Sequence, residues 1–332
     1  MASTSREDLI VVSSEGSELP YSRGLTAASI AGSGLPPDKA YAVAETVLQR
    51  LLRSGIKTVD ADTLEEVIAE TIEELAGTRF AANYRRWRSV SQLDRPLIIL
   101  IGGATGVGKS TIATLLASRL GITRVIPTDA IREVMRGMLT KELMPTLHTS
   151  SFDAESSITQ PLPRSADKAI IGFREQVQVV AVGINALIRR AVVEKTSLIV
   201  EGAHCCPGFL DLPDPDEAVV VHMVIAIESE RLHRSHFGFR ALEASKRAPE
   251  HYLKHFSNIR KIQRYIRNLA LRTGVAVIES YDVDSTLASC IDLVLERVTE
   301  ATRSEQKFRL SAPVPVDEAA SKASGSPKAN TS

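Results

Sequence analysis

The chain has 332 residues, 44% of them hydrophobic and 24% charged, which is typical of a soluble globular protein of about two domains. Forty basic residues balance forty acidic ones, so net charge alone indicates no anionic partner. The N-terminus has no basic segment followed by an apolar one, and the longest apolar run, residues 218–227, is too short to cross a bilayer. These observations predict a cytoplasmic protein that makes no membrane contact.

Residues 1–93 are predicted to form a small, mainly helical domain. Three amphipathic patterns begin with helix signals: Pro36-Pro37-Asp38, a capping box between Thr63 and Glu66, and residues 80–90 with Trp87 directed inward. Gly55 stands where the first of these helices should end. The Asp-Arg-Pro sequence at 94–96 marks the boundary with the next domain.

Residues 97–111 read LIILIGGATGVGKST, which combines a buried strand, a loop and the start of a helix. The loop matches the G-x-x-x-x-G-K-[ST] pattern of a P-loop, whose backbone N–H groups surround nucleotide phosphates. A Cβ at Gly106 or Gly108 would obstruct this arrangement. The sequence therefore predicts a nucleoside triphosphate site. Its residues are Gly103, Ala104, Thr105, Gly106, Val107, Gly108, Lys109, Ser110 and Thr111.

Residues 94–303 alternate short runs rich in Val and Ile with longer helical patterns, which predicts a doubly wound parallel sheet with helices on both faces. The predicted strands are residues 97–101, 124–128, 198–200, 219–227 and 275–278. Residues 304–332 are rich in Ser, Ala and Pro and are predicted to be a disordered tail.

The P-loop and the strand ends supply candidate catalytic groups. Lys109 is predicted to neutralise the β- and γ-phosphates of ATP, and Ser110 to give Mg²⁺ a hydroxyl ligand. Asp129 follows the second predicted strand, so it should face the P-loop, where it could orient or deprotonate an acceptor hydroxyl or bind Mg²⁺. Capping of the next helix is the alternative role for Asp129. Glu201 follows another apolar run and is predicted to orient Mg²⁺ through water.

Basic residues in two segments are candidates for binding anionic groups. Arg132 and Arg136 follow Asp129 on the predicted helix and could hold an anionic substrate, although a solvated helix face is an equal alternative. Basic residues outnumber acidic ones between residues 228 and 272, as in a cationic lid that closes over ATP. In this segment Arg231 and Arg234 are predicted to be catalytic and Arg240 to bind substrate.

Five segments together resemble 2-phosphoglycerate kinase: LIGGATGVGKSTIATLLASRLGI, PTDAIREVMR, ELMPTLHTSSF, LIVEGAHCCPG and HYLKHFSNIRKIQRYIRNLA. The resemblance covers nearly the whole chain, and residues 9–90 resemble the ATP-cone-type domain that precedes the kinase in that family. It implies ATP-dependent phosphorylation of the 3-hydroxyl of 2-phosphoglycerate to 2,3-bisphosphoglycerate. Within PTLHTSSF, His148 is a predicted substrate-binding residue. No basic residue stands on the first strand, at 11–15, which disfavours nucleotide binding by the N-terminal domain.

Other functions remain open at the level of sequence. Cys205 and Cys206 depart from the apolar residues expected after Glu-Gly-x-His, so another anionic hydroxy compound, such as an inositol phosphate or a phosphorylated polyol, is the alternative acceptor. A zinc site at these cysteines is disfavoured, because no second Cys/His pair stands at ligand spacing, and we expect core or loop thiols. A nucleic-acid-binding ATPase is a second alternative, disfavoured because no recognised binding pattern occurs. The sequence leaves open whether the chain forms a homo-oligomer.

Overall fold

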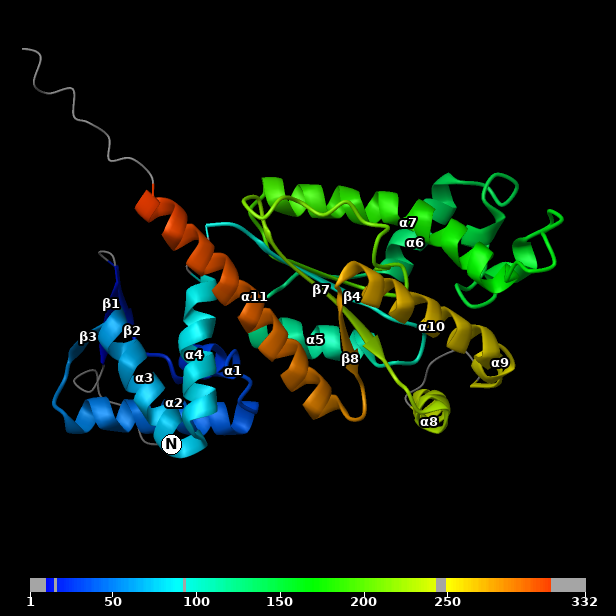
Figure 1. Ribbon diagram of the computed structural model, residues 1–332. Helices are drawn as coiled ribbons and strands as arrows, with labels where there is room; N and C mark the ends of the chain where they lie inside the picture. The colour runs from blue at the N-terminus through cyan, green and yellow to red at the C-terminus, as the bar shows by residue number, and fades with distance from the viewer. Residues whose placement is uncertain (1–9, 15–16, 92–93, 243–248, 312–332) are drawn as a thin grey trace, which may run out of the picture.

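The computed structural model describes residues 10–14, 17–91, 94–242 and 249–311. Figure 1 shows two parts: a small N-terminal domain, coloured blue to cyan, and a larger α/β domain built around one sheet. The two parts follow each other in the sequence, with the change of part at the Asp-Arg-Pro segment.

The N-terminal domain combines a small sheet with four helices. β1 pairs with β2 in antiparallel and with β3 in parallel orientation. The strands are β1 (Val11–Ser14), β2 (Ser17–Pro20) and β3 (Thr58–Asp60). The helices are α1 (Arg23–Ala31), α2 (Pro37–Arg53), α3 (Ala61–Ala76) and α4 (Thr78–Ser91). Their apolar faces meet in a separate core that includes Ile30, Val47 and Ile72.

The predicted capping box at Thr63 is wrong. The cap of α3 is Asp60, whose carboxylate accepts from the Thr63 backbone N–H at 2.8 Å and from the Thr63 hydroxyl at 2.7 Å. The helix therefore begins at Ala61, two residues before Thr63. The other two helix predictions agree with α2 and α4, and Gly55 has the positive φ of 70° expected after a helix end.

The α/β domain contains a five-stranded parallel sheet in the order β5-β6-β4-β7-β8. Each of its strands lies where the sequence predicts one. They are β4 (Leu97–Gly102), β5 (Val125–Pro127), β6 (Leu198–Glu201), β7 (Val219–Ala226) and β8 (Ala276–Glu279). The predicted doubly wound parallel sheet is confirmed, and its central strand β4 leads directly into the P-loop.

Helices cover both faces of this sheet, as alternating side chains of β4 show. Ile98 and Leu100 pack in one cluster with α6 and α7, whereas Ile99 and Ile101 pack with α5 and α11. The helices are α5 (Lys109–Leu120), α6 (Thr128–Met138), α7 (Lys168–Val193), α8 (Glu230–Leu242), α9 (Pro249–Lys254), α10 (Phe256–Thr273) and α11 (Val283–Ser311). Two short 3₁₀ helices, Pro145–His148 and Ala154–Ser157, lie between α6 and α7.

α11 extends beyond the boundary predicted at residue 303. It continues to Ser311, because the sequence after 303 still contains good helix formers such as Glu, Gln, Lys and Leu. Pro313 then follows, and proline disfavours helix both at itself and at the residue before it. Residues 304–311 therefore belong to a helix rather than to a tail, and residues 312–332 lie outside the described residues.

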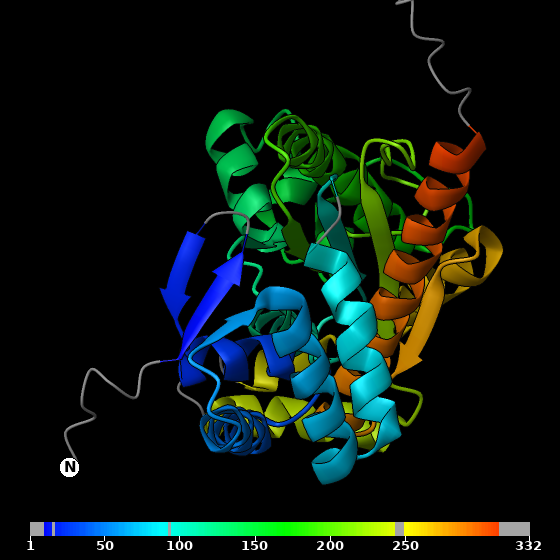
Figure 2. The ribbon, with the colours of Figure 1, turned by 90° about the vertical axis from the view of Figure 1, so that its left-hand side faces the viewer.

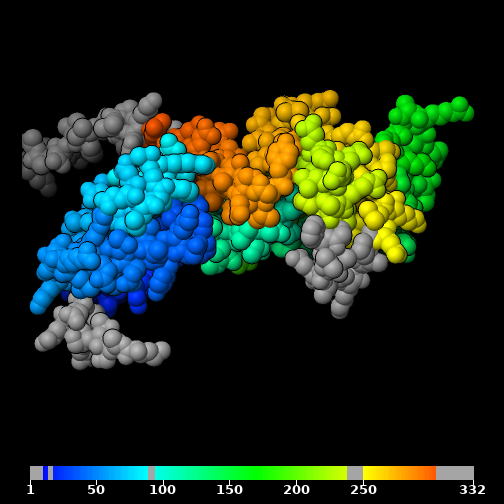
Figure 3. All heavy atoms as spheres, turned by 90° about the horizontal axis from the view of Figure 1, so that it is seen from below, coloured from blue at the N-terminus to red at the C-terminus, as the bar shows by residue number. Residues whose placement is uncertain are grey.

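The two domains contact each other through α4 and α11, which lie side by side in Figures 2 and 3. Asn83 donates from its Nδ2 to Asp292 Oδ1 at 3.3 Å, and Arg79 forms an ion pair with Asp292 at 2.7 Å. Trp87 is partly buried against the core of the α/β domain. Its ring also lies against Gly32 at the end of α1, so the side chain predicted to point inward is enclosed between the two domains.

α7 is long and apolar enough to cross a membrane by length and composition alone. In the folded chain it is a core helix instead, because Phe173, Val177 and Ile184 are buried against the sheet and its neighbouring helices. The helix also carries charged residues, including Arg174 and Arg190, on its exposed face.

Candidate active site

The P-loop joins β4 to α5 at the carboxyl edge of the sheet. Lys109 is the first residue of α5 and is only 7% exposed, and its Nζ donates to the Ala104 carbonyl oxygen at 2.7 Å. Ser110 donates from its hydroxyl to Glu201 Oε1 at 2.8 Å. The register pairs Ile101 on β4 with Glu201 on β6, which brings this carboxylate to the start of α5. The buried Lys109 ammonium group, the Ser110 hydroxyl and the Glu201 carboxylate therefore lie together at the start of α5.

The loop glycines are required for two different reasons. Gly106 and Gly108 both have a φ of 90°, which side chains with a Cβ rarely adopt. A Cβ at Gly106 would also lie 2.4 Å from the Phe237 ring, but a Cβ at Gly108 would meet nothing within 4 Å. Both glycines are therefore needed for their backbone conformation, and Gly106 also leaves room for the Phe237 ring; the obstruction of phosphate by a Cβ stays a prediction.

The two candidate carboxylates occupy different surroundings. Glu201 is buried and holds the Ser110 hydroxyl. Asp129 lies in the first turn of α6, its side chain is 75% exposed, and its Oδ1 is 3.4 Å from Arg132 Nε. The residue that precedes this helix is Pro127, so Asp129 is not its N-cap. The geometry pairs Ser110 with Glu201 and leaves Asp129 open to solvent.

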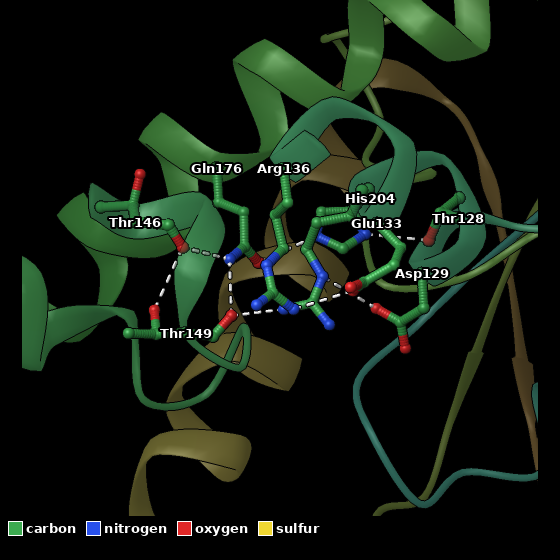
Figure 4. Close-up of polar contacts among 9 residues, drawn as sticks. Thr128, Asp129, Glu133, Arg136, Thr146, Thr149, Gln176 and His204 are labelled. Carbon is green, nitrogen blue, oxygen red and sulfur yellow. Dashed lines mark hydrogen bonds and ion pairs between the residues drawn. The ribbon is translucent and has the colours of Figure 1, made fainter. Parts of the chain in front are cut away.

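A chain of buried polar groups connects the end of β6 to the loop between α6 and α7 (Figure 4). Gln176 donates from Nε2 to the carbonyl oxygens of Thr146 at 2.6 Å and Thr149 at 3.1 Å. Its Oε1 must then accept from His204 Nε2, which lies 2.9 Å away. His204 Nδ1 in turn accepts from the Thr128 hydroxyl at 2.8 Å. These directions fix the neutral Nε2–H tautomer of His204.

The environment of His204 favours this neutral form. Burial lowers the pKa of His204 to about 4, with Asp129 opposing the shift and Arg132 adding to it. This arrangement depends on the close approach of β5 and β6. The approach is so close that a Cβ at Gly202 would lie only 1.8 Å from the Thr128 hydroxyl oxygen. Gly202 accordingly has a φ of 151°. His204 therefore acts as a fixed polar connector rather than as a charged group.

The predicted substrate-binding residues near α6 are held by the protein itself. Arg132, 7% exposed, donates from Nη1 to the Thr149 carbonyl oxygen. Arg136 forms an ion pair with Glu133 at 2.8 Å on the same helix. His148 donates from Nε2 to the Leu139 carbonyl oxygen at 2.9 Å, at the end of α6. These contacts fix the loop between α6 and α7, and a contact of these three residues with substrate stays a prediction.

The cationic lid residues lie on α8, which approaches the P-loop. Arg231 is exposed, and the Arg234 guanidinium lies 4.1 Å from the centre of the Phe256 ring, a cation–π contact. Arg240 is in the same helix, but its side chain lies outside the part of the chain that is described. Catalytic roles for these arginines remain predictions. The described side chains of α8 that form hydrogen bonds with the P-loop are instead His233 and His236.

The sequence-based predictions did not include Gln176 or Thr128, and they gave no site role to His204, His233 or His236. The sequence did contain one signal for two of these histidines: His233 and His236 are three residues apart, so they share one face of a helix. Gln176 stands inside an apolar helical pattern, where a single amide gives no sequence signal about its partner. Its contacts depend on the fold of the loop that precedes α7.

The chain is similar to several known proteins over most of its length. No family model matches the chain. The 2-phosphoglycerate kinase of Thermococcus kodakarensis is 40% identical over 293 residues, which cover 88% of this chain and 99% of the relative. That of Pyrococcus furiosus is 39% identical over 295 residues, covering 89% and 96%. That of Methanothermobacter thermautotrophicus is 37% identical over 284 residues, covering 85% and 91%.

The chain belongs to the 2-phosphoglycerate kinase family. This membership makes it an ATP-dependent phosphotransferase and confirms the family resemblance inferred from its motifs. Among solved structures, a protein of Chloroflexus aurantiacus named a putative kinase has a TM-score of 0.30 and 14% identity, covering 58% of this chain and 96% of that chain. That likeness is too weak to support a structural argument. The ATP-cone-type character of the N-terminal domain stays a prediction.

Proposed function

We propose that the chain phosphorylates the 3-hydroxyl of 2-phosphoglycerate with ATP, giving 2,3-bisphosphoglycerate. The observation that carries the proposal is the extent of the similarity, since relatives named 2-phosphoglycerate kinase match the chain across both of its domains. The site is consistent with it, because a P-loop with a buried lysine faces a carboxyl edge that also carries an exposed carboxylate and arginines.

Magnesium would be held by Ser110 and Glu201. Mg²⁺ usually takes only one or two protein oxygen ligands and completes its shell with water and phosphate oxygens, so a hydroxyl beside a buried carboxylate suits it. When bound, the ion would neutralise charge on the phosphates.

Several residues of the chain are proposed to take different parts in the phosphoryl transfer. Lys109 is positioned to bind the phosphates, and its burial strengthens its interaction with their charge. The 3-hydroxyl oxygen forms the new bond to the γ-phosphorus, the bond to the β–γ bridging oxygen breaks, and ADP leaves. Asp129 takes the proton of the hydroxyl, a role suited to an exposed carboxylate at a strand tip. Arg132 lies beside Asp129, and Arg136 follows on the same helix; both favour an anionic substrate.

The two cysteines that favoured another acceptor, such as an inositol phosphate, give that alternative little support. Cys205 and Cys206 are both fully buried, so the departure at these positions changes the core rather than the surface that meets a substrate. Cys205 donates from Sγ to the Val200 carbonyl oxygen at 3.4 Å. Binding of nucleic acid is also less favoured, because two of the three aromatic side chains on which bases could stack, Tyr252 and Phe256, are buried, and the third, Tyr265, is half-buried against Phe173.

A coupled assay of ADP release tests the proposed function. The purified chain would be given ATP and one acceptor at a time: 2-phosphoglycerate, 3-phosphoglycerate, glycerate or an inositol phosphate. We expect the largest kcat/KM with 2-phosphoglycerate, with the bisphosphate product identified by phosphorus NMR. A larger kcat/KM for an inositol phosphate would assign the alternative acceptor, and strongly salt-dependent oligonucleotide binding without any acceptor turnover would contradict the kinase assignment.

A further inference from the structure

One face of α8 lies directly against the tip of the P-loop. His233, His236 and Phe237 are three and four residues apart, so they project from the same side of the helix. His233 and Phe237 are almost completely buried, and their rings stack with centroids 5.5 Å apart. Phe237 occupies the space beside Gly106 that a Cβ would fill. The nucleotide loop therefore rests on a helix that follows it by more than one hundred residues.

Both histidines donate hydrogen bonds to successive carbonyl groups of the loop. His233 Nε2 lies 2.8 Å from the Thr105 carbonyl oxygen, and His236 Nδ1 lies 3.0 Å from that of Gly106. A carbonyl oxygen can only accept, so the hydrogen must be on Nε2 of His233 and on Nδ1 of His236. The two rings thus use opposite nitrogen atoms to reach neighbouring peptide groups.

These contacts determine where the next two backbone amides point. The described residues contain no cis peptide bond, and in a trans peptide the C=O and the following N–H point in opposite directions. A carbonyl of Thr105 held toward α8 directs the N–H of Gly106 away from α8, and the carbonyl of Gly106 does the same for the N–H of Val107. Hydrogen bonding at the carbonyl also polarises the peptide group and strengthens its N–H as a donor.

We propose that His233 and His236 are positioning residues for the triphosphate: they orient and polarise the Gly106 and Val107 amides that bind its phosphates. The proposal rests on the ATP-dependent function above. The arginines of α8 were predicted to act directly on the charge of the phosphates. In this proposal α8 also helps to bind the phosphates, but it acts through the backbone of the P-loop. Neither histidine needs to contact ATP itself.

Arg260 on α10 holds His233 in this orientation. Its guanidinium donates to the carbonyl oxygens of Ile227 at 2.6 Å and Glu228 at 2.8 Å, and its Nη1 lies 3.4 Å from His233 Nδ1. Burial lowers the pKa of His233 to about 4, so the ring is neutral and Nδ1 can accept from Arg260. A continuous path therefore runs from the end of β7 through Arg260 and His233 to the Thr105 carbonyl.

The test compares substitutions that keep or remove the donor. Asn places its Nδ2 near the position of histidine Nδ1, so His236→Asn keeps the hydrogen bond to Gly106, whereas His236→Leu removes it. Ser235→Ala is the matched control, because Ser235 is exposed on the same helix and donates only to the Leu232 carbonyl. Dissociation constants of the full-length chain for ATP and for inorganic tripolyphosphate would be measured by calorimetry, with circular dichroism to verify folding.

We expect His236→Leu to weaken the binding of both ligands roughly fivefold to tenfold, the effect of one hydrogen bond, and to raise KM for ATP more than it lowers kcat. His236→Asn and Ser235→Ala should stay within about twofold of the wild type. The variants His233→Gln and His233→Leu repeat the comparison at the other histidine, because glutamine Nε2 can replace histidine Nε2. His233 is buried, so His233→Leu can fail to fold; in that case the comparison of His236→Asn with His236→Leu decides between the outcomes.

Three other outcomes would overturn the inference in distinguishable ways. Equal affinities in the wild type and His236→Leu would show that the histidine does not position the loop. Equal losses in His236→Leu and His236→Asn would show a packing role without a role for the donor. A wild-type chain that binds neither ATP nor tripolyphosphate would overturn the proposed function and this inference together.

Discussion

Lys109 combines burial with a cationic group at the place where phosphate charge must be neutralised. Its Nζ contacts the Ala104 carbonyl within the P-loop. We predict that Lys109→Ala lowers kcat by roughly a hundredfold or more, because the lost interaction acts on charge that redistributes in the transition state. Steady-state kinetics and the melting temperature check this. A folded variant with near-normal turnover would contradict the kinase mechanism.

Asp129 and Glu201 should give distinct phenotypes when neutralised. The exposed Asp129 is proposed to take the acceptor proton, so Asp129→Asn should lower kcat while ATP affinity is kept. Glu201 holds Ser110, so Glu201→Gln should instead raise the Mg²⁺ concentration needed for half-maximal activity. Magnesium titrations of both variants distinguish the roles, and an exchange of the two phenotypes would reverse the assignment.

His204 should make the folded state sensitive to acid. Its pKa in the folded chain, about 4, is below its ordinary value of 6.5, so the unfolded chain binds the proton first. The neutral ring therefore contributes stability above pH 6.5 that is lost as the pH falls toward 4, at about 1.4 kcal/mol per pH unit. Urea unfolding at several pH values should show a shallower slope for His204→Gln. Equal slopes in variant and wild type would contradict this.

At the scale of secondary structure, α4 and α11 form the main contact between the domains. A chain that begins near Ser91 should keep the P-loop and bind ATP, because the candidate catalytic residues all follow Pro96. It should melt at a lower temperature than the full chain, since α11 loses the partners of Asp292 and the packing of Trp87. Calorimetric melting and ATP titration of the two chains check this. Loss of ATP binding in a folded short chain would contradict it.

The sequence predicted those elements whose signal is local. Five buried runs rich in Val and Ile became the five strands of the α/β sheet, and the P-loop pattern became the loop between β4 and α5. The cap of α3 was misplaced because Asp60 and Thr63 both satisfy local capping rules, and only the strand β3 before it decides for Asp60. The contacts of His204 with Gln176, or of His233 with Thr105, join segments far apart in the chain, which no local pattern can reveal.

At the scale of the whole molecule, we expect the chain to bind one ATP rather than two. β1 carries no basic residue, and the N-terminal pocket beside it is lined mainly by apolar side chains such as Val12, Leu25 and Ile68. The Arg88 in this pocket is paired with Glu65, so a triphosphate would meet little net positive charge. Titration calorimetry of the full chain should give one ATP per chain. Two ATP per chain would show a working regulatory site.

The direction of α11 has a practical consequence for handling the protein. α11 starts just after β8 ends, at the edge of the sheet that carries the P-loop, and runs back past the strands and along α4 to Ser311 (Figure 1). The last described residue therefore lies at the opposite edge from the nucleotide loop. A fluorescent label or a tether attached within the last turns of α11 would therefore stand away from the edge of the sheet that carries the P-loop.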